Sequence, residues 1–153
     1  MTKIFSALSL LLIVSSLTAC KTYSEEDKNG FDRKIKQFTQ QSGDKYTRSE
    51  SGMYYVIEKE GEGEFIKFTD VVSFTYTGKF LDGHTFDGRN SRKPVTYPVS
   101  DLIEGWKEIM FYLKKGGKAK VIIPPYLGYG DRSLDDIPPN SILFFEMEVT
   151  DVK

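Results

Sequence analysis

Aromatic side chains surround one short stretch of this sequence, Leu102-Ile103-Glu104-Gly105-Trp106. The flanking aromatic residues are Tyr76, Phe86, Tyr97, Tyr129 and Phe145. The same region holds almost no groups that could act as nucleophile, metal ligand or acid–base pair. Aromatic walls with little acid–base machinery suit a reaction whose barrier is rotation about a bond rather than bond cleavage.

Asp87 is the polar residue that stands out in this region. It directly follows Phe86 in surroundings that are largely apolar. A carboxylate there either faces solvent or is hydrogen-bonded, because a buried charge is retained only when it is paired. Its available partners are Tyr76 and either Arg89 or Arg92.

Other chemistry is poorly supported by the sequence. His84 is the single histidine and stands beside a hairpin turn, where a solvated side chain is the better interpretation. The lysines at 114, 115, 118 and 120 cluster without a nucleic-acid-binding motif, and the net charge is only −1. We therefore expect no metal, no cofactor and no nucleic-acid partner.

The first 19 residues predict a signal peptide. Lys3 precedes an apolar run, Ile4 to Val14, that is too short for a comfortable membrane span. The end of this segment, Leu17-Thr18-Ala19-Cys20, resembles the lipobox of bacterial lipoproteins, in which the cysteine is lipidated. An ordinary signal peptide with a chance cysteine is the alternative. We expect an extracytoplasmic, membrane-anchored lipoprotein attached through Cys20, the only cysteine of the 153 residues.

Residues 20–52 predict a polar tether with one short helix. Ser24 could cap a helix whose first turn is acidic, and Phe31, Ile35 and Phe38 follow at helical spacing. That apolar stripe is narrow, so a disordered spacer is the alternative.

A compact domain is expected over residues 53–153. Strands are predicted at 53–58, 71–80, 94–99, 118–123 and 142–149, where β-branched and aromatic residues concentrate. Leu81-Asp82-Gly83-His84 carries an Asp-Gly hairpin signal that returns the chain to Phe86. In the last strand, Leu143 and Phe145 alternate with Phe144 and Glu146.

One helix follows from the spacing of Ile103, Trp106, Met110 and Leu113. Asp101-x-x-Glu104 predicts a capping box, and Gly116 predicts the stop. The fold class is therefore α+β, with a twisted antiparallel β-sheet of five to six strands wrapped around one short α-helix.

From about Met53 onward the sequence resembles the FKBP-type peptidyl-prolyl cis-trans isomerases. The matching segments are 72–78 (VSFTYTG), 81–87 (LDGHTFD), 103–106 (IEGW), 115–119 (KGGKA), 123–125 (IPP), 129–130 (YG), 137–141 (IPPNS) and 143–148 (LFFEME). The resemblance implies a twisted antiparallel sheet curled around one short helix, in agreement with the pattern above.

The same resemblance implies roles for individual residues. Trp106 would form the floor of a proline pocket, with walls from Tyr76, Phe86, Tyr97, Leu102, Ile103 and Phe145. Asp87, hydrogen-bonded to Tyr76, would lie at the rim. The Tyr129 hydroxyl and the Ile137 backbone N–H would donate to substrate carbonyls. Catalysis would rest mainly on Asp87, Tyr129 and Phe86.

These roles fit rotation about Xaa-Pro bonds in exported or unfolded polypeptides. Resonance gives the amide a rotation barrier of about 18–20 kcal/mol, and an apolar pocket can favour its twisted, less polar state. A chaperone or proline-binding module with little catalysis is the alternative. Macrolide inhibitors are ligands that the family implies. Substrate preference and macrolide binding are left open by the loop Asp131–Asp136, which differs from the best-known members.

Overall fold

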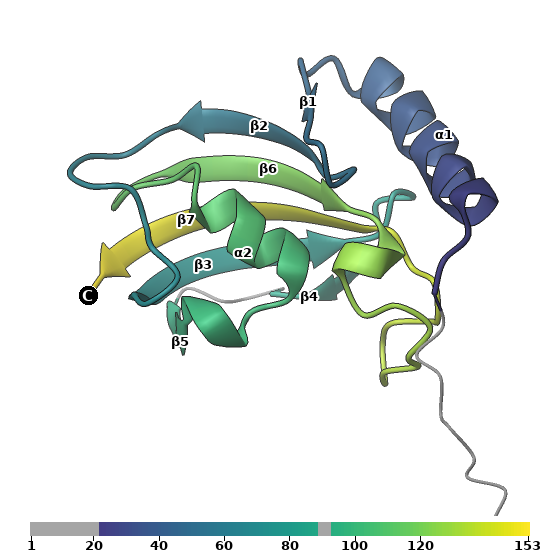
Figure 1. The fold of residues 1–153 in the computed structure, drawn as a ribbon. Helices are drawn as coiled ribbons and strands as arrows, with labels where there is room; N and C mark the ends of the chain where they lie inside the picture. The colour runs from purple at the N-terminus through teal and green to yellow at the C-terminus, as the bar shows by residue number, and fades with distance from the viewer. Residues whose placement is uncertain (1–21, 89–92) are drawn as a thin grey trace, which may run out of the picture.

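The computed structural model describes residues 22–88 and 93–153, which form one curved antiparallel sheet and two α-helices (Figure 1). The strands are β1 (Thr47–Arg48), β2 (Tyr54–Lys59), β3 (Val71–Lys79), β4 (Thr85–Asp87), β5 (Val95–Pro98), β6 (Lys118–Ile123) and β7 (Leu143–Val152). The helices are α1 (Glu25–Ser42) and α2 (Glu104–Met110), with single 3₁₀ turns at Val99–Asp101 and Pro125–Leu127. The predicted signal peptide, Cys20, Arg89 and Arg92 lie outside the described residues.

Strand order in the sheet is β1-β2-β6-β7-β3-β4, with β5 also paired to β3. The longest strands, β3 and β7, pair along their length, and Tyr76 lies opposite Met147. Alternation in β7 is as predicted: Phe145 is buried in the main core, together with Phe74 of β3, while Phe144 packs on the other face. The α+β fold class is confirmed.

The sheet has seven strands rather than five to six. The strand that sequence patterns missed is the two-residue β1, which pairs Thr47 with Tyr55 of β2. An edge strand this short is held by backbone hydrogen bonds and has no side-chain pattern to detect. It also belongs to the segment predicted as a tether.

Helix α2 packs against the concave side of the sheet, as Figure 1 shows, and buries Trp106, Ile109 and Met110 in the main core. Gly105 makes the close approach to β6 feasible, because a Cβ there would lie 2.7 Å from the Ile123 side chain. The helix is shorter than the spacing predicted and ends at Met110, before Leu113 and Gly116.

The predicted Asp101–Glu104 capping box is wrong. The N-cap of α2 is Ile103, with no side-chain cap, and Asp101 closes a separate 3₁₀ turn. Leu102 between them is extended, with φ −76° and ψ 159°. That extended residue separates the two turns, so the Asp101 carboxylate is not placed to cap α2.

Helix α1 is 18 residues long, so neither a short helix nor a disordered spacer describes this segment. The predicted Ser24 cap is present and forms a full capping box with Asp27. Ile35 is fully buried against Tyr54, Ile122 and Ile142, with Phe31 and Phe38 packed beside them. Because Val121 and Ile122 are neighbours in β6 and point to opposite faces, α1 covers the face of the sheet that α2 does not.

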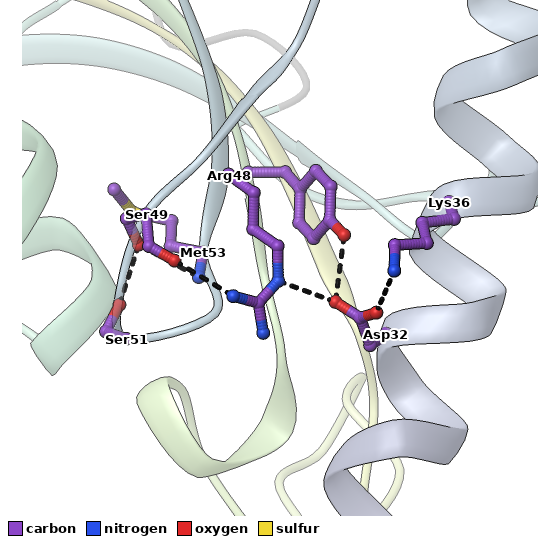
Figure 2. Close-up of polar contacts among 7 residues, drawn as sticks. Asp32, Lys36, Arg48, Ser49, Ser51 and Met53 are labelled. Carbon is purple, nitrogen blue, oxygen red and sulfur yellow. Dashed lines mark hydrogen bonds and ion pairs between the residues drawn. The ribbon is translucent and has the colours of Figure 1, made fainter.

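A polar cluster fixes α1 to the first strands (Figure 2). The Asp32 carboxylate accepts from Arg48 Nε and the Tyr54 hydroxyl at 2.8 Å each and pairs with Lys36 Nζ at 2.8 Å. Partial burial opposes the charged form, yet these three partners lower the pKa of Asp32 to about 2. Within the described ranges, neither helix has the length and apolar character needed to cross a bilayer.

Candidate active site

The predicted floor of the candidate site is the indole ring of Trp106, which is 8% exposed. Its ring makes edge contacts with Phe74, Tyr76 and Phe145 at centroid distances of 5.2, 4.8 and 4.8 Å. Helix α2 supplies the indole, the middle of β3 supplies Phe74 and Tyr76, and the beginning of β7 supplies Phe145. Such edge-to-face pairs are favourable because the positive edge of one ring meets the negative face of another.

One wall comes from Phe86 of the short strand β4. Its ring meets that of Phe145 at 5.7 Å, nearly perpendicular, and that of Phe80 at 4.9 Å. Gly78 makes room for this wall, because a Cβ at that position would lie 2.7 Å from the Phe86 ring and 2.9 Å from the Phe145 ring. The hairpin predicted from Asp82-Gly83 delivers Phe86 to this place, and Gly83 has the required positive φ of 89°.

The Tyr76 hydroxyl donates to Asp87 Oδ2 at 2.5 Å, so the predicted partner of the carboxylate is present. Asp87 Oδ1 accepts from the Gly88 backbone N–H at 2.6 Å. Burial, and then the hydrogen bond to Asp87, raises the pKa of Tyr76 well above its usual range. Tyr76 therefore stays protonated and holds the carboxylate at the rim across the physiological pH range.

Tyr129 presents a hydroxyl that makes no hydrogen bond with any residue in the described ranges. Its ring packs against the main core, and burial together with the Asp87 charge raises its pKa. The group is thus a neutral donor available to a ligand. Tyr97 is 48% exposed, and its hydroxyl lies close enough to influence the pKa values of Tyr76 and Tyr129.

The other residues predicted for the site, Leu102, Ile103 and Ile137, differ in how far they are buried. Leu102 and Ile137 are buried, and Ile103 is half-buried against the same core. The Ile137 N–H donates to the Leu134 carbonyl at 3.2 Å within a tight turn. The structure therefore gives this N–H an internal acceptor, and its role as a donor to substrate stays a prediction.

Phe74 is fully buried and its ring contacts that of Trp106, although the site prediction omitted it. Strand alternation with Tyr76 is the signal that could have identified it, since residues two apart share a face. Tyr23 is a second omission. Its hydroxyl donates to Asn140 Oδ1 at 2.7 Å across 117 positions of sequence, a separation at which no local pattern exists.

The site offers hydrogen-bond donors but few acid–base groups. The Trp106 Nε1–H is buried and has no partner among the described residues. The described ranges contain no group of His, Cys, Asp or Glu arranged to hold a metal ion. His84 is exposed and stacks on Phe80 at 6.0 Å, as a surface turn residue does. The arrangement can desolvate an apolar group and donate hydrogen bonds at its rim.

Comparison with known proteins agrees with this geometry. Residues 62–150 match the family model described as FKBP-type peptidyl-prolyl cis-trans isomerase. The chain belongs to this family. FkpA of Buchnera aphidicola from Schizaphis graminum is 44% identical over 121 residues, which are 78% of this chain and 47% of that protein.

Solved structures show the same fold. FkpA from Escherichia coli superposes with a TM-score of 0.73 at 36% identity, covering 84% of this chain and 62% of that one. A peptidyl-prolyl cis-trans isomerase from Pseudomonas syringae gives 0.70 over 87% of this chain and 98% of that one; at 23% identity it supports the fold alone. This chain spans about half the length of the FkpA relatives from Buchnera.

Proposed function

We propose that this protein is a peptidyl-prolyl cis-trans isomerase that acts on Xaa-Pro bonds of exported polypeptides. The observation that carries the proposal is the buried indole of Trp106, ringed by Phe74, Tyr76 and Phe145, with Tyr129 packed against the same core and its hydroxyl making no hydrogen bond to a described residue. Membership of the FKBP-type family supports it.

The chemistry needs only binding and desolvation. Water stabilises the polar, planar amide, so transfer of the prolyl bond into an aromatic pocket weakens that stabilisation and favours the twisted state. A proline ring placed on the indole would leave its flanking carbonyls near the rim, where Tyr129 can donate. The cis and trans forms differ by only about 0.5–1 kcal/mol, so no energy source is required.

The test is a protease-coupled isomerisation assay with Xaa-Pro peptides on the full chain in detergent. We expect acceleration over the uncatalysed rate. A rate equal to the uncatalysed one, with peptide still bound, would instead favour a proline-binding module or chaperone. Adding a macrolide to the same assay tests whether the inhibitor class that the family implies also slows isomerisation by this chain.

The cellular location of the protein is part of the proposal. Lipidation of Cys20 would attach the chain to a membrane outside the cytoplasm. Two residues, Lys21 and Thr22, separate Cys20 from Tyr23, so the three steps from one Cα atom to the next span at most about 11 Å in any conformation. Since Tyr23 is bonded to Asn140 near the active site, the anchor would hold that site close to the bilayer surface.

Membrane fractionation tests the anchor directly. We expect the wild-type chain in the membrane fraction and Cys20→Ala in the soluble fraction. A Cys20→Ala variant that stays with the membrane would rule out lipidation at this residue.

A further inference from the structure

A groove of about 400 Å³ lies beside the proline pocket, and we call it the flanking groove. Ile103 and Tyr129 line it and also belong to the predicted proline site, so the groove adjoins that site. Pro125, Tyr126 and Gly130 line its loop side, and Tyr23 lines its N-terminal side. The volume falls in the range of about 300–1,000 Å³ that ligand sites have.

Tyr23 is firmly held in this wall. It is 8% exposed, its hydroxyl donates to Asn140, and its ring packs edge-on against Phe31 of α1 at 5.6 Å and beside Tyr126 at 6.1 Å. A wall fixed before binding loses little conformational entropy when a ligand arrives. Tyr23 also lies outside the 62–150 range that matches the family model.

The loop side of the groove is tied to the same tyrosine. The Asn140 N–H donates to the Gly130 carbonyl at 2.8 Å, and Asn140 adopts a positive φ of 61° that asparagine tolerates. The acceptor of the Tyr23 hydroxyl is therefore the residue that closes the base of the Asp131–Pro139 loop. Both sides of the groove are thus set by one contact between the N-terminal segment and this loop.

The lining indicates what the groove would bind. The buried Tyr23 and the half-buried Ile103 and Tyr129 give its lining an aromatic and aliphatic surface, while the exposed Glu104, Asp131 and Arg132 add mixed charge. Mixed charge gives no preference for a charged ligand, whereas the apolar surface of Tyr23, Ile103 and Tyr129 suits an aliphatic or aromatic side chain.

We propose that the flanking groove is a substrate subsite that binds the residues next to the proline in an extended polypeptide, with Tyr23 as its outer wall. The inference rests on the proposed isomerase function, because it places the proline itself over Trp106. A chain in extended conformation advances about 3.3 Å per residue, so a polypeptide leaving the pocket past Ile103 and Tyr129 enters the groove within a few residues.

The test compares two peptides on the full chain in detergent. One is the tetrapeptide Ala-Leu-Pro-Phe, and the other extends the same core with leucine and phenylalanine on both sides. Fluorescence of Trp106, the single tryptophan, reports binding independently of turnover. The variants are Tyr23→Ala and Tyr23→Phe, with Phe65→Ala as an exposed aromatic control.

We expect the longer peptide to bind the wild-type protein about five- to tenfold more tightly than the tetrapeptide. Tyr23→Ala should remove most of this advantage, Tyr23→Phe should keep it because the ring remains, and Phe65→Ala should change neither affinity. In the unaltered protein, the amide signals of Gly128 and Gly130 should shift with the longer peptide and not with the tetrapeptide.

Equal affinity for the two peptides, or unshifted Gly128 and Gly130 amides, would overturn the subsite. So would an equal loss for both peptides in both Tyr23 variants, which would make Tyr23 a support of the loop. Binding of the longer peptide through Tyr23 without any turnover would leave the subsite standing and refute the proposed isomerase activity.

Discussion

The two faces of the sheet are covered by helices but are built differently. The α2 face carries a large core in which aromatic rings meet edge to face around Trp106. The α1 face has a small core around Ile35 and adds the hydrogen-bonded carboxylate of Asp32. The first face groups aromatic rings around one indole beside the groove that Ile103 and Tyr129 line, whereas the second uses apolar and polar contacts to dock a helix.

The neighbours Phe145 and Phe144 test this difference most directly, since they point to opposite faces of β7. Phe145→Ala should lower the free energy of unfolding by about 3–5 kcal/mol, because it removes a fully buried ring. It should also abolish most isomerase activity, because that ring contacts Trp106. Urea denaturation and the protease-coupled assay measure the two effects.

Phe144→Ala is the matched control for this change. It should lower stability by less, since Phe144 is only partly buried, and it should keep the activity. Equal losses of activity in the two variants would show that the faces do not act separately.

Ile35→Ala probes the α1 face alone. The substitution leaves a cavity between α1 and the sheet and should cost about 2–4 kcal/mol in the free energy of unfolding. Activity on a tetrapeptide should stay at the wild-type rate at temperatures where the variant is folded. Lys34→Ala, on the exposed side of the same helix, should change stability by less than about 0.5 kcal/mol.

Acid should weaken the α1 face through Asp32. Its pKa of about 2 in the folded protein lies below the ordinary value of 3.8, so its stabilising contribution is complete above pH 4 and is lost as the pH falls through 2. We expect a contribution of about 1–2 kcal/mol, allowing for solvent screening of the exposed lysine and arginine partners. Denaturation at a series of pH values should show this loss in the wild-type protein and a smaller one in Asp32→Asn.

Among these substitutions on the α2 face, Tyr129→Phe should change stability and activity the least. It removes one hydroxyl that makes no hydrogen bond to the described residues, so stability should stay within about 0.5 kcal/mol. The kcat/KM for Xaa-Pro peptides should fall about three- to tenfold, the value of one hydrogen bond to substrate. Unchanged kcat/KM would remove Tyr129 from the proposed site.

Sequence patterns predicted the α2 face in most of its parts. Alternation along β7 indicated that Phe145 and Phe144 point to opposite faces, and the Asp-Gly turn returned Phe86 beside Phe145. The hydrogen bond between Asp87 and Tyr76 was implied by the family resemblance, whereas spacing alone left Tyr76 and two arginines open. The predicted Asp101 cap was wrong because Leu102, which is extended, lies between Asp101 and the start of α2. The helix or strand propensity of a leucine does not predict an extended conformation at this position.

The α1 face was less predictable. The stripe of Phe31, Ile35 and Phe38 indicated an amphipathic helix, yet a stripe does not specify the surface that covers it. The partners Tyr54, Ile122 and Ile142 come from three distant parts of the chain. The flanking groove has the same origin, since Tyr23 and Asn140 are joined only when the chain has folded.

The sequence by itself therefore determined which residues are buried together within a strand or hairpin, because side-chain periodicity and turn chemistry act over a few residues. It also determined the chemistry of the pocket, since only aromatic and few ionisable groups were present to build it. The tertiary structure alone decided that the N-terminal helix is part of the fold, that Tyr23 closes a groove beside the site, and that the Ile137 N–H turns toward Leu134. These contacts join residues far apart in the chain, and their formation depends on the packing of the whole sheet rather than on any local preference.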